Sequence, residues 1–566
     1  MQIFKAVHKN MVFPLSGRVF SLLLLTVIYS GFASEPLLRI GVMSDTHVTH
    51  SPSSCTILED TMRLFKEQKA DVIINAGDIA DVYNDKAYRN YRNTVNKVYA
   101  DSKNRPVEIF AYAYHDIIGH KSNSPWEAFK DVKKYLEAQN DPYDIVKVKG
   151  YVFVAMPQYH QPDEYKELLD RAEKERDGKP FFIIDHVPLH DTVDGSLNGN
   201  TYARELAAKH PDAVHISGHN HSLLTNELNI WQGELTAINA GFLHGSMVVK
   251  KSCDVAMIME VYQDKIVCRR FFVDSRKEYL SGKNPWTIPL PFDQKSAPYS
   301  RENRLKNSAA PCFAPDAKIK VSVSEKGANI EFPHASPAGD IYKYQVDLFK
   351  TSEKNGAPFA GKKIYGPFMK GGKTPEKPAA LDFSIGYFEY GKDYQIKITP
   401  FNFAGKSGSP LAATFKVNAK SQAKVVFESR NPMQECLCSY GVTGSEKYKN
   451  AGNEFHYDGF YNVDREKITV RVHFPPHVWK GKERGRIIFD MQNIFPPDRS
   501  LHMQLRCLAP RRYIPGYILT VPGNTAVTRY VIETGSLKRG DYDFYLNLKN
   551  GGPGKIKFDY IRVERY

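Results

Sequence analysis

Several apolar runs in the first half of the chain end in histidine or aspartate, and this arrangement constrains the fold more than any other feature. Helical patterns separate the runs: LLRIGVMSD is followed by ILEDTMRLFKE, in which Leu58, Met62 and Phe65 fall on one face of a helix. Short buried strands that alternate with amphipathic helices are typical of a layered α/β domain. The polar run ends are Asp45-Thr-His47, Gly77-Asp78, His115-Asp116, His186-Val-Pro188 and Gly218-His219-Asn220-His221.

These run ends predict a metal site. In an open α/β sheet, ligands bind in the crevice beyond the carboxyl ends of the strands, so we expect these side chains to converge. Neutral imidazoles and carboxylates suit zinc, iron or manganese, and a shared carboxylate, here Asp78, can hold two ions roughly 3.5–4 Å apart. Taken singly, an Asp-x-His is more often a turn or a helix cap, and a solitary His186 is usually a surface or core residue. The ordered set, each member ending its own predicted strand, favours the metal site.

In order and spacing, the set resembles the motifs of the calcineurin-like metallophosphoesterase superfamily, over about residues 37–275. The resemblance implies an α/β fold, a four-layer β-sandwich flanked by helices, with two divalent ions (Mn, Fe or Zn). It implies one ion held by Asp45, His47, Asp78 and His221, and the other by Asp78, His186 and His219. It further implies that metal-activated hydroxide hydrolyses a phosphomonoester or phosphodiester, with His115 as general acid and Asp116 orienting its ring.

Tyr114 departs from the family pattern. The family normally has Gly-Asn-His followed by Asp or Glu, where this chain has Ala113-Tyr114-His115-Asp116. The missing asparagine ordinarily ligates the second ion, whereas a phenol binds a metal well only once it is deprotonated. Three outcomes stay open: the second ion binds weakly, Tyr114 is an atypical ligand, or the site holds one ion with altered activity. We expect an active enzyme with an unusual second site.

The rest of the chain is β-rich. We expect the α/β domain to cover residues 37–285 and a linker rich in Pro and Ser to cover 286–312. Residues 313–420 resemble a fibronectin type III module, with Phe332 in place of the usual early tryptophan. Residues 424–566 end in GGPGKIKFDYIRVERY, which is similar to the closing strand of galactose-binding-like jelly rolls. The α/β domain is therefore expected to be followed by two all-β sandwich modules.

The first 33 residues have the pattern of a secretory signal. Lys5, Lys9 and Arg18 precede the apolar run VFSLLLLTVIYSGFA, which ends in small residues. An uncleaved anchor is the alternative, but the run is short of the roughly 20 residues that a spanning helix needs. No later segment is long enough to span, so we expect a secreted or periplasmic protein.

The formal net charge of +14 attracts acidic partners of any kind. No basic helix, RNA-binding signature or zinc finger gives a strong nucleic-acid signal. Trp479 and the cluster FHYDGFYN could stack on the sugar faces of a glycan or cell-surface ligand, although aromatics packed in a sandwich core are several times more common. The rival to a phosphate-ester hydrolase is therefore a catalytically weakened phosphoesterase-fold protein that acts as a cell-surface or carbohydrate-binding protein.

Overall fold

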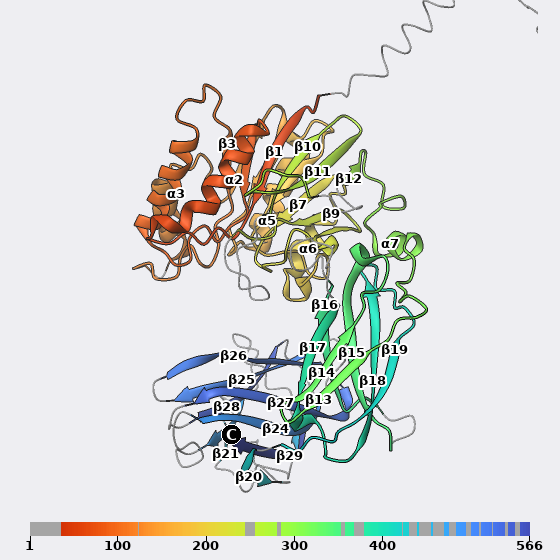
Figure 1. The fold of residues 1–566 in the computed structure, drawn as a ribbon. Helices are drawn as coiled ribbons and strands as arrows, with labels where there is room; N and C mark the ends of the chain where they lie inside the picture. The colour runs from red at the N-terminus through yellow and green to blue at the C-terminus, as the bar shows by residue number, and fades with distance from the viewer. Residues whose placement is uncertain are drawn as a thin grey trace, which may run out of the picture.

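The computed structural model describes residues 35–122, 124–243, 255–279, 285–352, 357–366 and 378–421, residue 423, and the C-terminal strands between 424 and 565. The predicted signal, residues 1–33, lies outside the described residues. In Figure 1 the α/β region lies at the top, a middle sandwich at the lower right and the C-terminal strands at the lower left. Strand β1 runs from the top of the view toward the two all-β units, so its carboxyl end is on the side that faces them.

Two six-stranded mixed sheets form the centre of the α/β region. The first has the order β12-β11-β10-β1-β2-β3, in which β1, β2 and β3 are parallel and β10, β11 and β12 are antiparallel. Its strands are β1 (Leu38–Met43), β2 (Val72–Asn75), β3 (Val107–Phe110), β10 (Val255–Val261), β11 (Lys265–Phe272) and β12 (Trp286–Pro289). The predicted α/β fold is confirmed in this region.

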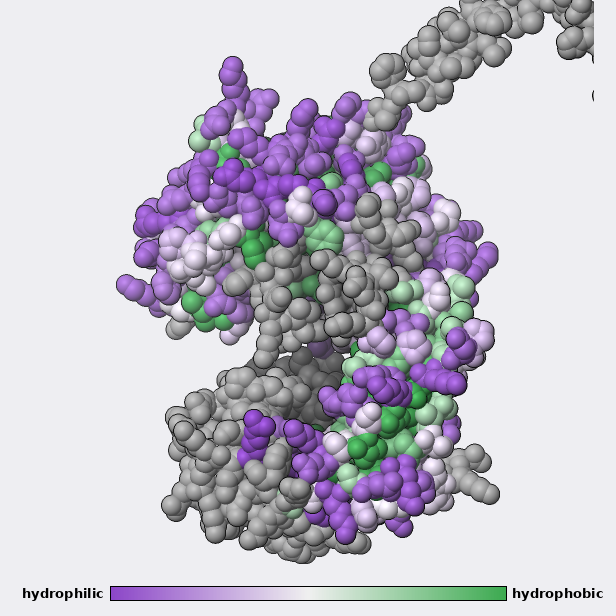
Figure 2. Space-filling view, viewed as in Figure 1, coloured by the Kyte–Doolittle hydropathy of each residue, from purple (hydrophilic) through white to green (hydrophobic). Residues whose placement is uncertain are grey.

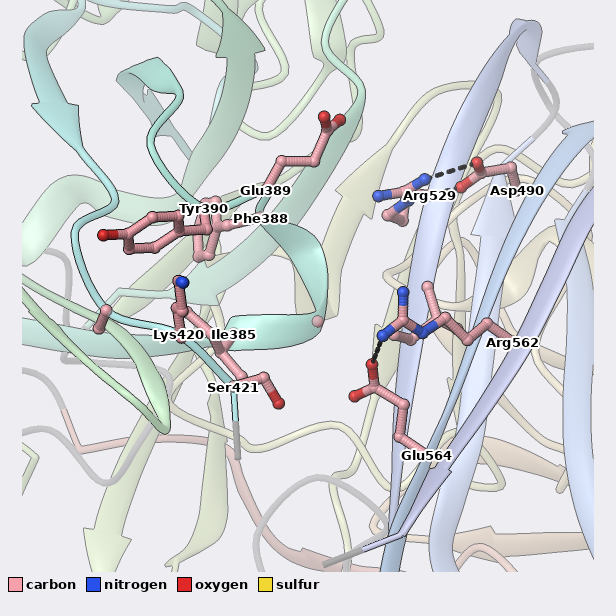
Figure 3. Close-up of a pocket in the computed structure, with 13 residues that line it drawn as sticks. Ile385, Phe388, Glu389, Tyr390, Lys420, Ser421, Asp490, Arg529, Arg562 and Glu564 are labelled. Atoms are coloured by element: carbon pink, nitrogen blue, oxygen red, sulfur yellow. Dashed lines mark hydrogen bonds and ion pairs between the residues drawn. The ribbon is translucent and has the colours of Figure 1, made fainter. Parts of the chain in front are cut away.

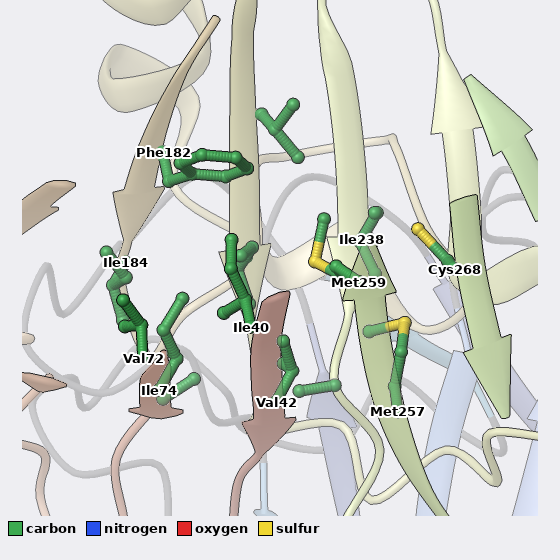
Figure 4. Packing of buried hydrophobic residues seen from close by; sticks show 14 of the residues in the cluster. Ile40, Val42, Val72, Ile74, Phe182, Ile184, Ile238, Met257, Met259 and Cys268 are labelled. Atoms are coloured by element: carbon green, nitrogen blue, oxygen red, sulfur yellow. The ribbon is translucent and has the colours of Figure 1, made fainter. Parts of the chain in front are cut away.

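The second sheet has the order β4-β5-β6-β7-β9-β8, with parallel pairing from β5 to β9. Its strands are β4 (Asp144–Val148), β5 (Tyr151–Ala155), β6 (Phe181–Ile184), β7 (Ala213–Ser217), β8 (Ile230–Gln232) and β9 (Thr236–Asn239). Figure 4 shows the apolar core between the two sheets, where Ile40 and Val42 face the side of Phe182 and Ile184. Burial of each such side chain contributes about 1.5–3 kcal/mol and fixes one sheet against the other.

Helices cover the outer faces of both sheets. The first sheet packs against α2 (Thr56–Glu67), α3 (Asp85–Val98) and α4 (Pro125–Leu136), and the second against α5 (Pro162–Glu175) and α6 (Thr201–Ala207). Leu58, Met62 and Phe65 are buried, as the helical pattern predicted. The short 3-10 turns of this region are η1 (Pro52–Cys55), η2 (Ser196–Asn198) and η3 (Glu227–Asn229). No helix of the described residues is long and apolar enough to cross a membrane.

Part of the predicted linker is ordered against the α/β region. Residues 286–289 form β12, and the buried indole of Trp286 donates a hydrogen bond from Nε1 to Glu227 Oε2 at 2.8 Å. The guanidinium of Arg270 lies 4.1 Å from the Trp286 ring centroid, so a cation–π contact adds to this packing. Helix α7 (Arg301–Asn307) follows. Prolines suggested a linker here, but a buried tryptophan and strand pairing outweigh that local signal.

The middle sandwich, residues 320–416, packs a three-stranded sheet on a four-stranded one. Its strands are β13 (Lys320–Ser324), β14 (Gly327–Phe332), β15 (Ile341–Lys350), β16 (Ala360–Tyr365), β17 (Ala379–Ser384), β18 (Asp393–Asn402) and β19 (Leu411–Lys416), with turns η4 (Ala338–Asp340) and η6 (Ile385–Tyr387). Phe332 is buried, and its ring centroid lies 5.0 Å from that of Tyr344. Figure 2 shows hydrophobic side chains gathered over this sandwich, whereas the α/β region presents mostly hydrophilic ones.

The C-terminal strands form two five-stranded antiparallel sheets. They are β20 (Lys424–Ser429), β21 (Cys438–Tyr440), β22 (Glu454–His456), β23 (Thr469–Phe474), β24 (Glu483–Asn493), β25 (Ser500–Leu508), β26 (Arg511–Pro522), β27 (Asn524–Leu537), β28 (Tyr542–Lys549) and β29 (Lys555–Arg565). Trp479 lies outside the described residues. The β-rich secondary structure predicted for this region is therefore confirmed.

Candidate metal centre

The six predicted ligands converge at the carboxyl ends of strands from both sheets. Asp45 and His47 follow β1, Asp78 follows β2, His186 follows β6, and His219 and His221 follow β7. Ligand atoms of Asp45, His47 and His221 lie within 4.8 Å of one another, and so do those of Asp45, Asp78 and His186. The predicted convergence is therefore present in the structure.

One subsite lies between Asp45, His47 and His221. His221 Nε2 is 3.1 Å from Asp45 Oδ1 and 3.2 Å from His47 Nε2. Two nitrogens bound to one tetrahedral zinc at about 2.1 Å would lie about 3.4 Å apart. The spacing of the two imidazole nitrogens is therefore close to that of a shared cation.

The second subsite lies between Asp78, His186 and His219. His186 Nε2 is 3.1 Å from Asp78 Oδ2 and 3.3 Å from His219 Nδ1. His186 Nδ1 lies 2.8 Å from the carbonyl oxygen of Ala76, which can only accept, so the ring donates there and Nε2 is turned into the centre. A backbone carbonyl that fixes the tautomer in this way is typical of metal-binding histidines. Asp78 Oδ2 also lies 4.0 Å from His47 Nε2, so this carboxylate reaches toward both subsites.

Buried polar atoms without hydrogen bonds show that this residue set suits cations. Asp45 is fully buried, and its Oδ2 accepts hydrogen bonds from Ser44 Oγ at 2.7 Å and from the amide of His219 at 3.0 Å. Asp45 Oδ1 and His47 Nδ1 are buried and make no well-directed hydrogen bond, although His221 Nε2 lies 3.1 Å from Asp45 Oδ1. A buried carboxylate oxygen without a well-directed hydrogen bond costs free energy, and a bound cation would remove that cost.

Strained backbone holds the ligands in place. Five of the proposed ligands have left-handed backbone, with φ angles of 48° at Asp45, 40° at His47, 52° at Asp78, 70° at His219 and 45° at His221. Such left-handed residues cost about 1–3 kcal/mol each and cluster at functional sites. Two glycines permit the close packing that this requires, since a Cβ would lie 2.7 Å from His186 Nδ1 at Gly77 and 1.8 Å from Ser44 Oγ at Gly218.

The carboxylates and imidazoles of the centre perturb one another's protonation. Burial works to raise the pKa of Asp45, but hydrogen bonds from His221 and His47 hold that pKa well below its usual value. Burial works to lower the pKa of His186, but the adjacent Asp78 and Asp45 carboxylates raise it to about 10. Without metal, the centre therefore keeps its carboxylates ionised and His186 protonated near neutral pH.

This protonation predicts that metal binding releases a proton. Below the pKa of about 10, a cation must displace the proton of His186, so its apparent affinity should rise up to about tenfold per pH unit. Calorimetric titration of the metal-free protein with Mn²⁺ between pH 7 and 9, in buffers that differ in ionisation enthalpy, measures both the affinity and the proton count. An affinity independent of pH, with no proton released, would contradict the prediction.

His115 lies beside the centre, but Asp116 does not orient it. The His115 amide donates to Asp78 Oδ1 at 3.1 Å, and its ring Nδ1 lies 2.5 Å from the carbonyl oxygen of Asp81. The buried carboxylate of Asp116 instead accepts backbone hydrogen bonds from Ile79, Ala80 and Ala113 at 3.0–3.2 Å. The expected contact between Asp116 and the His115 ring is therefore replaced by the Asp81 carbonyl. Burial raises the pKa of Asp116 to about 7.

Tyr114 does not turn its side chain into the protein interior. Its side chain is 50% exposed, and within the described residues its hydroxyl makes no hydrogen bond. Its backbone amide donates to Gln158 Oε1 at 2.7 Å. The three outcomes for this position, including Tyr114 as an atypical ligand, stay predictions.

The sequence did not assign roles to Asp81, which lies beside the ligand His47, or to Asn220, which lies between two ligands in the chain. Asp81 Oδ1 lies 3.6 Å from His47 Nδ1, and Asp81 shares a possible ligand cluster with His47 and His115. Asn220, between two ligands, donates from Nδ2 to the carbonyl of Asp194 at 2.7 Å. The position of Asn220 inside the Gly-His-Asn-His motif was the one signal that could have identified it.

A second polar site, a cavity of about 720 Å³, lies between the middle sandwich and the C-terminal strands (Figure 3). Arg529 Nε donates to Asp490 Oδ1 at 2.7 Å, and Arg562 Nη2 lies 2.7 Å from Glu564 Oε1. On the other wall Tyr390 is 57% exposed, and Lys420 Nζ lies 4.5 Å from its ring centroid. The cavity therefore combines donors, acceptors and an exposed aromatic ring.

Residues 38–223 match the family model of the calcineurin-like phosphoesterases, so this part of the chain is a calcineurin-like phosphoesterase domain. Among solved structures, the chain is similar to a dimetal phosphatase from Danio rerio (13% identity, 45% of this chain and 99% of that chain, TM-score 0.30). It is also similar to GAP50, the anchor in the inner membrane complex of Plasmodium (15% identity, 46% and 90%, TM-score 0.30). A third similarity is to the CBM22-1 xylan-binding domain of Paenibacillus barcinonensis Xyn10C (9% identity, 25% and 95%, TM-score 0.18). No curated protein matches the chain.

Proposed function

We propose that this protein is an exported metal-dependent hydrolase of a phosphomonoester or phosphodiester. One observation carries the proposal: two clusters of carboxylates and imidazoles, with Asp78 Oδ2 3.1 Å from His186 Nε2 and 4.0 Å from His47 Nε2, meet at the strand ends of a calcineurin-like phosphoesterase domain. The family uses divalent metals, and a phosphate ester is the substrate class that the domain implies. The proposed location outside the cytoplasm rests on the charge and apolar pattern of residues 1–33.

Six residues of the chain would hold the two ions, which in turn would bind the phosphate of the substrate. Asp45, His47, Asp78 and His221 would hold one ion, and Asp78, His186 and His219 the other, with manganese, iron or zinc as suitable metals. When bound, such a pair of ions acidifies water near neutral pH and neutralises the charge of a phosphate. Asp78 is the residue that both subsites need.

His115 is the proposed general acid. Its Nδ1 is anchored by the Asp81 carbonyl, and its ring centroid lies 4.9 Å from that of His47, at the edge of the centre. The anchored Nδ1 keeps its proton, so Nε2 is the atom that would give a proton to the leaving oxygen. Asp116 is a positioning residue in this proposal, because it binds the backbone amides around Asp78 and His115.

Hydrolysis of nitrophenyl phosphate monoesters and diesters with added Mn²⁺ tests this function. We expect turnover that is abolished by a chelator and restored by Mn²⁺, because the proposed nucleophile is water that the bound ions acidify. Turnover that is insensitive to chelation would contradict a metal-dependent mechanism. The ratio of monoester to diester rates assigns the substrate subclass.

Tyr114→Asn is predicted to raise occupancy of the second ion. Asparagine would place a side-chain carbonyl oxygen, a hard ligand, where the family has one, without the bulk of the phenol. We expect the Mn²⁺ content of the dialysed protein to rise by up to one ion per chain, measured by elemental analysis. Two tightly held ions in the wild type, unchanged by the substitution, would contradict this prediction.

A second candidate function is saccharide binding by the cavity between the middle sandwich and the C-terminal strands. Planar charged groups such as Arg562 and Asp490 can bind vicinal hydroxyls, and the exposed ring of Tyr390 offers an apolar contact. We expect the full chain to bind glycans on an array, and Arg562→Ala to lose at least about tenfold in signal. Arg89→Ala, an exposed arginine of α3, is the matched control. Absence of glycan binding by the wild type would rule out this candidate.

A further inference from the structure

A loop of the α/β region connects the metal centre to the middle sandwich. The loop lies between β6 and α6 and contains Asp194, which is reached from three directions. Asn220 Nδ2 donates to the Asp194 carbonyl at 2.7 Å, and Asn226 Nδ2 donates to Asp194 Oδ2 at 2.8 Å. From the middle sandwich, the hydroxyl of Tyr342 donates to Asp194 Oδ1 at 3.2 Å. Asp194 therefore joins two modules through its own atoms.

The hydrogen bond from Asn220 involves a residue that lies between two proposed ligands in the chain. Asn220 separates His219 from His221, and both histidines have left-handed backbone, with φ of 70° and 45°. Such conformations persist only where the surroundings determine them. The hydrogen bond from the Asn220 side-chain amide to the Asp194 carbonyl is one contact of this kind, and Gly195 lies close enough that an added Cβ would be 3.4 Å from Asn220 Cγ.

Aromatic packing within the middle sandwich positions the side chain of Tyr342. Tyr342 lies in β15, and its ring packs against those of Tyr365 and Phe403, with centroids 5.8 and 5.6 Å away. Arg301 adds a second fixed point, since its guanidinium pairs with both carboxylate oxygens of Asp191 at 2.7 and 2.9 Å. The loop is thus tied to elements beyond the phosphoesterase fold.

We propose that the middle sandwich positions the metal centre, with Tyr342 acting through Asp194 and Asn220 on the backbone that carries His219 and His221. The inference rests on the proposed metal centre and adds a role for a module that is otherwise only a spacer. Tyr342 is a positioning residue, because it touches neither the ligands nor the substrate. Groups that hydrogen-bond a metal ligand directly typically change metal affinity by about 10–100-fold when removed, so for Tyr342, which acts through two intervening residues, we expect the lower end of that range.

Mn²⁺ binding by the full chain tests this inference without relying on turnover. Tyr342→Phe keeps the ring and removes the hydroxyl, and we expect it to weaken Mn²⁺ binding about tenfold. Tyr365→Phe is the matched control, because it is the same change in a neighbouring ring whose hydroxyl makes no hydrogen bond within the described residues. We expect its affinity to equal that of the wild type. Circular dichroism and the metal-free melting temperature show whether each variant folds.

Asn220→Ala and the double variant distinguish coupling from general loosening. If Tyr342 acts through Asn220, the double variant should bind Mn²⁺ no more weakly than Asn220→Ala alone. Unchanged affinity in folded Tyr342→Phe, or fully additive losses in the double variant, would overturn the inference and leave the proposed function intact. A wild type that binds no Mn²⁺ would overturn the proposed function and this inference together.

Discussion

Asp78→Asn is expected to abolish phosphoesterase activity and binding of the second ion. The Asp78 carboxylate lies 3.1 Å from His186 Nε2 and 4.0 Å from His47 Nε2, so its charge serves both subsites. An amide keeps the shape but removes that charge and one ligand atom, which leaves two cations to repel each other. Since paired ions contribute several kcal/mol to such reactions, we expect kcat/KM to fall by about 10³-fold or more.

Metal content and protonation separate this effect from misfolding. Elemental analysis should find at least one ion fewer in Asp78→Asn, and NMR titration of the metal-free variant should show a lower pKa for His186, which loses the carboxylate that raises it. Asp85→Asn, an exposed residue at the start of α3, is the matched control and should retain wild-type rates. Equal activity in both variants would contradict a shared carboxylate at Asp78.

The convergence of the six ligands could be predicted because strand ends are encoded locally. Each apolar run ends at its polar residue, and parallel strands place such ends at one edge of a sheet. The contacts that orient these groups could not be predicted in the same way. The Asp81 carbonyl that contacts His115 and the amides that bind Asp116 are backbone groups, so the amino-acid types in the sequence do not indicate them.

Contacts between residues far apart in the sequence could not be predicted either. Tyr342 and Asp194 are 148 residues apart, and neither belongs to a motif. Trp286 stands among prolines that indicate a linker, yet its indole is buried against Glu227 and its strand pairs with β11. Local composition reports the preference of a segment, whereas these positions are decided by partners that only the folded chain brings near.

His115→Ala is expected to slow hydrolysis in a manner that depends on the leaving group. A general acid contributes about 10²–10⁴-fold when the departing alkoxide needs a proton. A nitrophenolate leaves without one, so the same substitution should cost far less with nitrophenyl esters. The measurement is kcat/KM for a series of phosphate esters of rising leaving-group basicity, and the variant should show the steeper dependence.

His120→Ala is the control that isolates this role. His120 lies five residues further along the same loop, where its ring pairs with Asp131 at 3.2 Å rather than with the centre, so its removal should leave the dependence unchanged. A loss in His115→Ala that is equal for all leaving groups would instead mean that His115 acts on the metal centre. That result is physically reasonable, because the substitution also removes the ring that packs edge-on against His47. The slope, rather than the size of the loss, therefore decides whether Nε2 of His115 delivers the proton.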